Sequence, residues 1–131
     1  MKKIITLLIG ALLISTAAMA GGYQYISAAD LKTKIDNNAQ GLLLDIQVEV
    51  EFAEHHIPGA VATFAYPVKS DQDKQKLQTF IAAAKESSEP VTIVCPRGGG
   101  GAKRAYDYLK EQGVPESRLN ILQGGQAKWP F

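Results

Sequence analysis

The sequence predicts one α/β domain with a central, mainly parallel sheet that is flanked by helices. Two observations point to this fold class. Short apolar runs of the kind found in buried parallel strands alternate with segments whose apolar residues recur at helical spacing. The connections between them are short, and no repeat or linker interrupts them. Such an alternation favours a parallel sheet with right-handed crossovers, built into a single domain.

The first half of this domain is expected to contain a helix and then a buried strand. Ser27 and Asp30 have the spacing of a capping box at a helix start, and Gly41 follows the expected helix end. Leu42 to Ile46 is a short apolar run that closes on Asp45, a pattern typical of a buried parallel strand. Further along lie one or two helical turns at Glu49 to His55, a turn at Ile57 to Ala60, and an extended segment from Val61 to Val68.

A second helix is expected between Ser70 and Pro90. Ser70 and Asp73 form another capping box, apolar residues recur at helical spacing as far as Ala84, and Pro90 ends the segment. Two more buried strands and a third helix complete the domain. The strands are Val91 to Val94 and Leu119 to Leu122, and the helix between them carries Ala102, Ala105 and Leu109 and ends at Gly113.

Composition agrees with a globular domain and excludes several classes of protein. Of the 131 residues, 46% are hydrophobic and 21% are charged, which is typical of folded proteins and excludes intrinsic disorder. Lysine and arginine number 14 against 13 acidic residues, so we expect no basic face for nucleic acid. A single cysteine excludes a disulfide framework, a zinc ribbon and a C-x-x-C redox pair.

Residues 1–20 have the pattern of a cleavable export signal. Two lysines precede an apolar core from Ile4 to Ile14, and Ala18-Met19-Ala20 supplies the small residues that a signal peptidase accepts. The core is shorter than the roughly 20 residues that span a bilayer, which argues against a stable membrane anchor. We therefore expect cleavage after Ala20, a mature domain of residues 21–131 and a periplasmic location.

The cysteine lies where ligands bind in α/β proteins. In an open α/β sheet, ligands bind beyond the carboxyl ends of the strands, where a loop leads into a helix N-terminus. Cys95 directly follows a predicted strand and precedes a helix that is expected to begin near Gly101 or Ala102. The connecting loop consists of Pro96, Arg97, Gly98, Gly99, Gly100 and Gly101.

The glycines of this loop favour an anion at the cysteine sulfur. They allow the backbone to curl and to aim its N–H groups inward, at the positive end of a helix. That environment favours the thiolate of Cys95 over the thiol, and the same N–H groups suit a persulfide or a substrate oxyanion. The alternative is a buried, inert cysteine before a loose turn. Four consecutive glycines pack poorly and cost conformational entropy, so we favour the ligand site.

Other interpretations of a glycine-rich loop do not fit the spacing. A Walker A loop requires Gly-Lys followed by Ser or Thr, whereas Lys103 follows Ala102 and is followed by Arg104. A dinucleotide fingerprint that starts at Gly98 or Gly99 would require glycine at position 103 or 104, where Lys103 and Arg104 stand. A cysteine phosphatase requires arginine six positions after its nucleophile, where this chain has Gly101. His55 and His56 are adjacent, so their side chains diverge and no metal site is expected.

Three ordered motifs in residues 23–131 carry a family resemblance. They are Leu44-Asp45-Ile46-Gln47 followed by Glu51-Phe52 and His56-Ile57-Pro58-Gly59-Ala60; Val91-Thr92-Ile93-Val94-Cys95 followed by Gly101-Ala102; and Leu122-Gln123-Gly124-Gly125-Gln126-Ala127-Lys128-Trp129. Together they resemble the rhodanese family of sulfurtransferases. The resemblance implies a single rhodanese-like domain without a cofactor, whose partners are a small sulfur-containing donor and a thiol or other nucleophilic acceptor.

The same resemblance implies roles for individual residues. Cys95 would be the nucleophile that accepts sulfane sulfur as a persulfide, and the amides of residues 96–101 would hold that persulfide. Asp45 ends a strand near the loop and is expected to brace it by accepting backbone N–H bonds, although a simple strand-end cap is the alternative. His56 is expected to be a hydrogen-bonded residue of the turn that follows it, and Trp129 to pack in the core.

The sequence departs from the family's C-R-x-G-x-[RT] loop and D-x-R segment. Gly100 replaces the closing arginine or threonine, Gln47 replaces the arginine, and Pro96 lacks an N–H. Arg97 could compensate, as could Lys103 or Arg104 on the following helix. We therefore expect thiosulfate, a dianion, to be a poor donor. Two alternatives stay open: a non-catalytic rhodanese-like binding module, and a thiol redox or oxyanion-handling protein that uses the same cysteine.

Overall fold

The computed structural model describes residues 19–20 and 22–131, and it contains a six-stranded sheet in the order β1-β2-β6-β5-β3-β4. The short β1 pairs with β2 in antiparallel fashion, and every other pairing is parallel. The five parallel strands confirm the predicted fold class. The strands are β1 (Met19–Ala20), β2 (Tyr23–Ile26), β3 (Leu42–Asp45), β4 (Val61–Ala62), β5 (Val91–Val94) and β6 (Leu119–Leu122).

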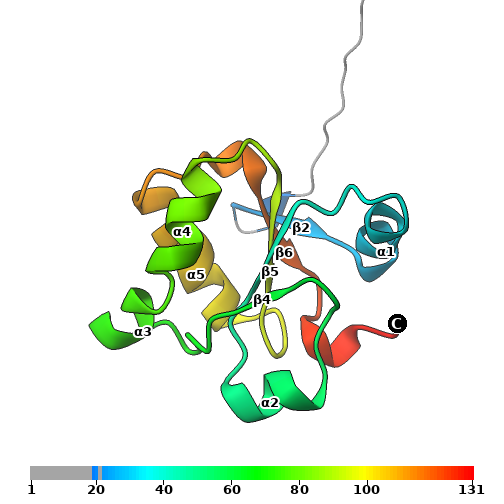
Figure 1. The fold of residues 1–131 in the computed structure, drawn as a ribbon, viewed down its shortest axis with the longest axis horizontal. Helices are drawn as coiled ribbons and strands as arrows, with labels where there is room; N and C mark the ends of the chain where they lie inside the picture. The colour runs from blue at the N-terminus through cyan, green and yellow to red at the C-terminus, as the bar shows by residue number, and fades with distance from the viewer. Residues whose placement is uncertain (1–18, 21) are drawn as a thin grey trace, which may run out of the picture.

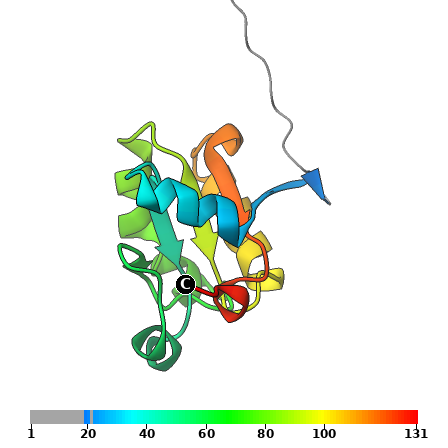
Figure 2. The same ribbon diagram turned by 90° about the vertical axis from the view of Figure 1, so that its right-hand side faces the viewer.

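Helices cover both faces of this sheet. In Figure 1, α4 and α5 lie on one side of the strands and α1 on the other, and Figure 2 shows α1 crossing in front of the sheet. The α-helices are α1 (Ala28–Asp36), α2 (Glu49–Glu54), α3 (Asp71–Gln75), α4 (Gln78–Lys85) and α5 (Gly100–Glu111). Two 3₁₀ turns, η1 (Glu116–Arg118) and η2 (Gln126–Lys128), flank β6.

Alternate residues of the central strands fill two separate hydrophobic cores. Successive side chains of a strand point to opposite faces of its sheet. Accordingly, Leu44 and Ile93 pack with the buried residues of α4 and α5, whereas Leu43 and Val94 pack with Leu31 of α1 on the other face. Trp129 belongs to this second core and is 6% exposed, as the sequence predicts.

Both predicted helix starts are confirmed at the level of single hydrogen bonds. The Ser27 hydroxyl accepts from the Asp30 N–H at 3.0 Å, and the Ser70 hydroxyl accepts from the Asp73 N–H at 3.0 Å. At the second site the Asp73 carboxylate also accepts from the Ser70 N–H, which completes the capping box. These bonds satisfy backbone donors that a helix start otherwise leaves unpaired.

Three details of the chain path differ from the sequence prediction. The helix expected from Ser70 to Ala84 is divided into α3 and α4, because the polar α3 buries no residue and the chain turns before burying Leu77. The extended segment Val61 to Val68 pairs over only two residues. Beyond them the chain turns at Phe64 and Val68, whose φ angles are +58° and +60°. The strand β2 was not predicted.

Of the predicted export signal, residues 1–20, the structure describes only Met19 and Ala20. Met19 and Ala20 pair with β2, opposite Gln24 and Tyr23. The remainder of the predicted signal, residues 1–18, lies outside the described residues, so cleavage and export stay predictions. Within the part of the chain that the structure describes, no helix is long and apolar enough to cross a membrane.

Candidate functional site

Cys95 lies at the carboxyl end of β5, at the start of the loop that leads into α5. Its side chain is buried, and the residue is 2% exposed. The backbone N–H of Gly98 points back at the sulfur and donates to Sγ at 2.8 Å. The helix begins at Gly100, slightly earlier than expected, so the sulfur lies near the positive end of a 12-residue helix. This loop therefore has the geometry that stabilises negative charge on sulfur.

The turn after β6 holds the Cys95 loop in place by main-chain contacts. The N–H of Gln126 donates to the Cys95 carbonyl at 2.8 Å, and the N–H of Ala127 donates to the Pro96 carbonyl at 2.9 Å. The backbones approach so closely that a Cβ atom on Gly125 would lie 2.2 Å from the Cys95 carbonyl oxygen. Only glycine fits there, and Gly125 also has a φ of +60°.

Asp45 does not brace the loop in the direct way that the sequence suggests. Its fully buried carboxylate accepts from the backbone N–H of Gln47 at 2.8 Å and from the Gln47 side-chain amide at 3.1 Å. Burial raises the pKa of Asp45, while the two bonds from Gln47 act in the opposite direction. Asp45 therefore orients Gln47, and the main-chain bonds from Gln126 and Ala127 hold the loop.

Gln47 borders a pocket of 320 Å³ that opens beside the loop, between α2 and η2. Pro96 and Arg97 line it on the loop side, and the carboxylates of Glu51 and Glu54 line it on the α2 side. Another wall is formed by Gln126, whose side chain is 5% exposed. One amide nitrogen of Gln126 lies 3.3 Å from Nδ1 of His55, and its buried Oε1 has no partner among the described residues. Such an atom is open to a donor from a ligand.

The comparison with known families matches most of the chain. A family model described as the rhodanese-like domain matches residues 27–130. The chain belongs to the rhodanese-like domain family. This match covers every described element from α1 to η2, and it confirms the resemblance seen in the sequence. Among curated proteins, none matches the chain.

Solved structures share the fold at low sequence identity. A rhodanese-like domain from an Anabaena protein has a TM-score of 0.61 at 21% identity, over 80% of this chain and 71% of that one. A rhodanese-related protein from Thermoplasma volcanium has a TM-score of 0.57 at 22% identity, covering 82% and 90%. A Rhodopseudomonas palustris protein, named a possible tyrosine phosphatase, has a TM-score of 0.55 at 17% identity, covering 82% and 79%. These likenesses show the fold alone.

The loop of this rhodanese-like domain has no room for the arginine of a cysteine phosphatase. That arginine would stand six positions after Cys95, at Gly101. A Cβ atom on Gly101 would lie 2.7 Å from the ring of Tyr66 and 3.4 Å from Ile46. Because Tyr66 already fills the space that a side chain would need, the structure agrees with the sequence argument against a phosphatase loop.

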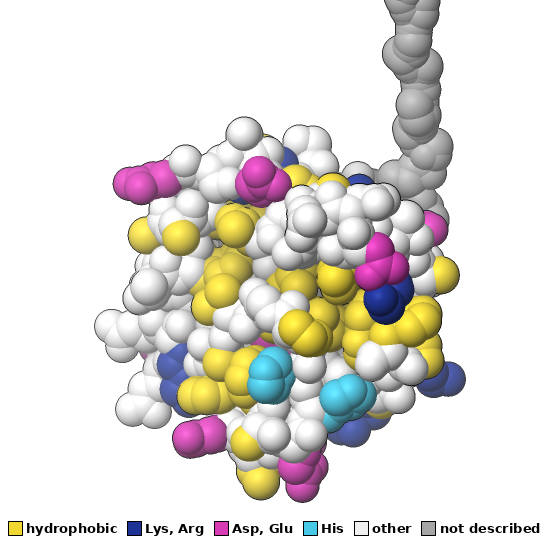
Figure 3. Space-filling view, turned by 45° about the vertical axis from the view of Figure 1, so that its right-hand side comes forward, with side chains coloured by type: hydrophobic (Ala, Val, Ile, Leu, Met, Phe, Trp, Pro, Cys, Tyr) yellow, Lys and Arg dark blue, Asp and Glu magenta, His cyan; other side chains and the backbone are white. Residues whose placement is uncertain are grey.

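The two histidines of the rhodanese-like domain lie in different surroundings. His56 stacks on the Phe52 ring at 3.9 Å between centroids, and its Nδ1 lies 2.7 Å from the Phe52 carbonyl oxygen. This is the hydrogen-bonded role that was predicted for it. Figure 3 shows the chain's two histidines as separate side chains on one face. Among the described residues, no three His, Cys, Asp or Glu side chains cluster in a way that could hold a metal ion.

Proposed function

We propose that this protein is an exported sulfurtransferase or sulfur carrier in which Cys95 forms the persulfide. One observation carries the proposal. The only cysteine of the chain is seated in a glycine-rich loop, at the start of a helix, with the Gly98 N–H donating to Sγ at 2.8 Å. A hydrogen bond to a charged acceptor is about twice as strong as one to a neutral acceptor, so this amide favours thiolate and persulfide anions.

The proposed reaction has two steps that balance in atoms and charge. In the first, the Cys95 thiolate attacks the terminal sulfane sulfur of a donor such as thiosulfate. A bond forms between Sγ and that sulfur, the sulfur–sulfur bond of the donor breaks, and sulfite leaves with the electron pair. In the second, a nucleophilic acceptor such as cyanide or a thiolate attacks the outer sulfur of the persulfide. It takes that sulfur and returns the Cys95 thiolate.

The burial of the thiol favours small donors over the redox alternative. Because Cys95 is 2% exposed, a bulky protein disulfide cannot align with Sγ without displacing the loop. A small donor needs far less room than a protein disulfide, and a pocket of 320 Å³ lies beside Pro96 and Arg97 of the same loop.

The mass of the intact protein tests this proposal most directly. The protein is mixed with thiosulfate, polysulfide or mercaptopyruvate, desalted without reductant, and weighed. We expect Cys95 to gain one sulfur atom, which cyanide then removes as thiocyanate, and we expect the Cys95→Ser variant to gain none. If no donor adds sulfur, the non-catalytic binding module is the better account. If small disulfides form mixed disulfides with Cys95 while every sulfur donor fails, the redox alternative replaces the proposal.

The export half of the proposal rests on the composition of residues 1–20 and has its own test. We expect the protein to be recovered from the periplasmic fraction of a bacterial cell with Gly21 as its first residue. Recovery of membrane-bound protein that still begins at Met1 would overturn this half without affecting the role of Cys95. As a control, a chain that lacks residues 1–20 should remain in the cytoplasmic fraction.

A further inference from the structure

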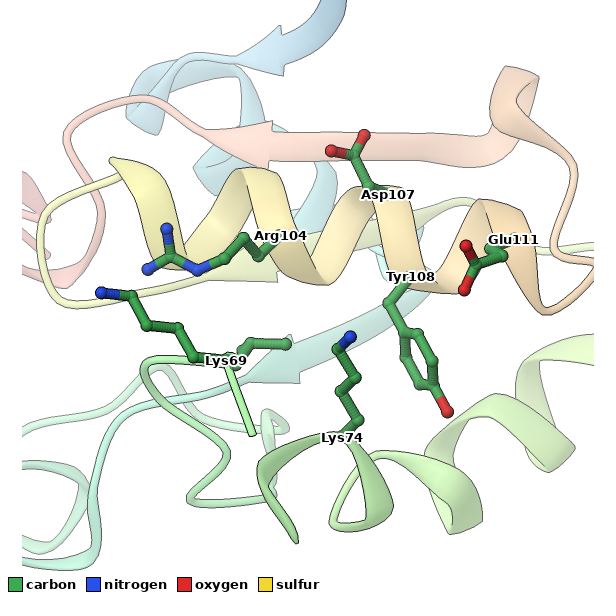
Figure 4. A pocket seen from close by; sticks show the side chains of 7 residues that line it. Lys69, Lys74, Arg104, Asp107, Tyr108 and Glu111 are labelled. Atoms are coloured by element: carbon green, nitrogen blue, oxygen red, sulfur yellow. The ribbon is translucent and has the colours of Figure 1, made fainter. Parts of the chain in front are cut away.

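We propose that a cationic cleft between α3 and α5 binds a divalent oxyanion and supplies positive charge beside Gly100, where the loop has no cationic side chain. The proposal rests on the proposed function, since the anion would be the anionic end of the sulfur donor. The cleft has a volume of 260 Å³. Figure 4 shows the side chains around it, namely Lys69, Lys74, Arg104, Asp107, Tyr108 and Glu111.

Arg104 lines this cleft and also lies beside Gly100 of the Cys95 loop. Its Nε donates to the Pro67 carbonyl at 2.9 Å, which anchors the guanidinium between α5 and the segment before α3. The same guanidinium lies against the first residue of α5: a Cβ atom on Gly100 would be 3.0 Å from Nη1 of Arg104. Gly100 is the position at which the family pattern has a closing arginine or threonine. A cation from the next turn of the helix therefore occupies the space beside it.

The side chains that line the cleft include three cations (Lys69, Lys74 and Arg104) and two carboxylates (Asp107 and Glu111), and this excess of positive charge favours an anion. In Figure 4, Lys69 reaches toward the same end of the cleft as the guanidinium, and Lys74 points up into the cleft. Among the described residues, none of these three cations is within ion-pair distance of a carboxylate. Asp107 points away and accepts from the Tyr23 hydroxyl at 2.9 Å. The positive end of the α5 dipole adds to this potential, so a bound anion would relieve the mutual repulsion.

The shape of the cleft limits the kind of anion it takes. A volume of 260 Å³ suits a small oxyanion better than a nucleotide or a peptide. The planar guanidinium of Arg104 can donate to two oxygens at once, which matches a sulfonate-type group. The pocket on the other side of the loop is less suitable for a dianion, because Glu51 and Glu54 line it opposite Arg97.

Calorimetric titration with thiosulfate tests the cleft separately from sulfur transfer. The titrations use the Cys95→Ser background, in which no persulfide can form. We expect Arg104→Gln to weaken thiosulfate binding about tenfold or more. The matched control is Lys103→Gln, which removes the same charge one position earlier on the helix, where Nζ lies over the Tyr23 ring at 5.6 Å. It should change binding less than about twofold.

Two further measurements keep the proposal falsifiable. If Arg104→Gln fails to fold, because it loses the bond to Pro67, the double variant Lys69→Gln/Lys74→Gln should show the same weakening from cleft-lining lysines. Equal thiosulfate affinity in the Cys95→Ser protein with and without these cleft substitutions would overturn the proposal. Sulfur loading of Cys95 from dissolved elemental sulfur, an uncharged donor, should be unchanged in every cleft variant. If elemental sulfur loads Cys95 but Arg104→Gln leaves thiosulfate binding unchanged, the cleft proposal is wrong and the proposed function stands. If thiosulfate binding depends on Arg104 but no donor loads Cys95, the cleft proposal stands and the proposed function is wrong.

Discussion

Replacing Gly125 by alanine should destabilise the protein and distort the Cys95 loop. The residue has φ +60° and ψ −159°, a region that is essentially restricted to glycine and that costs other residues about 1–3 kcal/mol. The new methyl group would lie 2.2 Å from the Cys95 carbonyl oxygen and 2.5 Å from the Gly98 nitrogen. Both atoms belong to the backbone, so relief requires moving the loop, at about 1–3 kcal/mol more. We expect a total loss of about 2–6 kcal/mol in the free energy of unfolding.

Urea denaturation measures this loss against a control in the same loop. With a slope near 2 kcal/mol per molar urea, the midpoint should fall by about 1–3 M without a change in slope. Gly99→Ala is the control, because Gly99 has φ −103° and a Cβ atom there would have nothing within 4 Å. It should change stability by no more than about 0.5 kcal/mol. If Gly125→Ala matches Gly99→Ala in stability and still loads sulfur on Cys95, the main-chain contact does not shape the loop.

The remaining predictions concern charge and capping. Burial raises the pKa of Asp45 above its ordinary 3.8, so the folded state keeps the proton to higher pH and loses stability as pH rises through that range. Urea denaturation should therefore show that the unsubstituted protein is more stable relative to the Asp45→Asn variant near pH 3.5 than near pH 7. Ser70→Ala should cost about 1 kcal/mol in the same assay by removing the α3 cap. Gly100→Arg should not tighten thiosulfate binding in the calorimetric titration, since Arg104 already occupies the adjacent space.

The parts of the fold that the sequence predicted well are those controlled by local chemistry. Ser27 and Ser70 cap helices because their hydroxyls accept from the N–H of the third residue that follows. This interaction is local and does not depend on contacts with distant segments. The strand before Cys95 was predictable for a similar reason, since four apolar residues buried on both faces have few other structures open to them. The position of Cys95 at the end of that strand followed directly.

The parts that the sequence did not predict depend on contacts between distant segments. Asp45 was expected to bind the loop, but Gln47 is two residues away and competes successfully for its carboxylate. The sequence alone could not show which of Arg97, Lys103 and Arg104 would lie beside Gly100. The guanidinium of Arg104 is placed there by the carbonyl of Pro67, which lies 37 residues earlier in the chain. Gly124 and Gly125 were a signal in the sequence, yet nothing local indicated that they face the Cys95 loop.

The main-chain nature of the loop contacts explains how this protein can depart from the family pattern. The bonds to the Cys95 and Pro96 carbonyls come from backbone N–H groups of η2, so they do not depend on which side chains the loop carries. A proline at position 96 retains its carbonyl, and a glycine at position 100 loses only a side chain. In the arrangement that we propose, the loop geometry and the charge that recognises a donor are supplied by different segments. Substituting Arg104 or Lys69 should accordingly change which anion binds, while the Gly98 N–H continues to donate to the Cys95 sulfur.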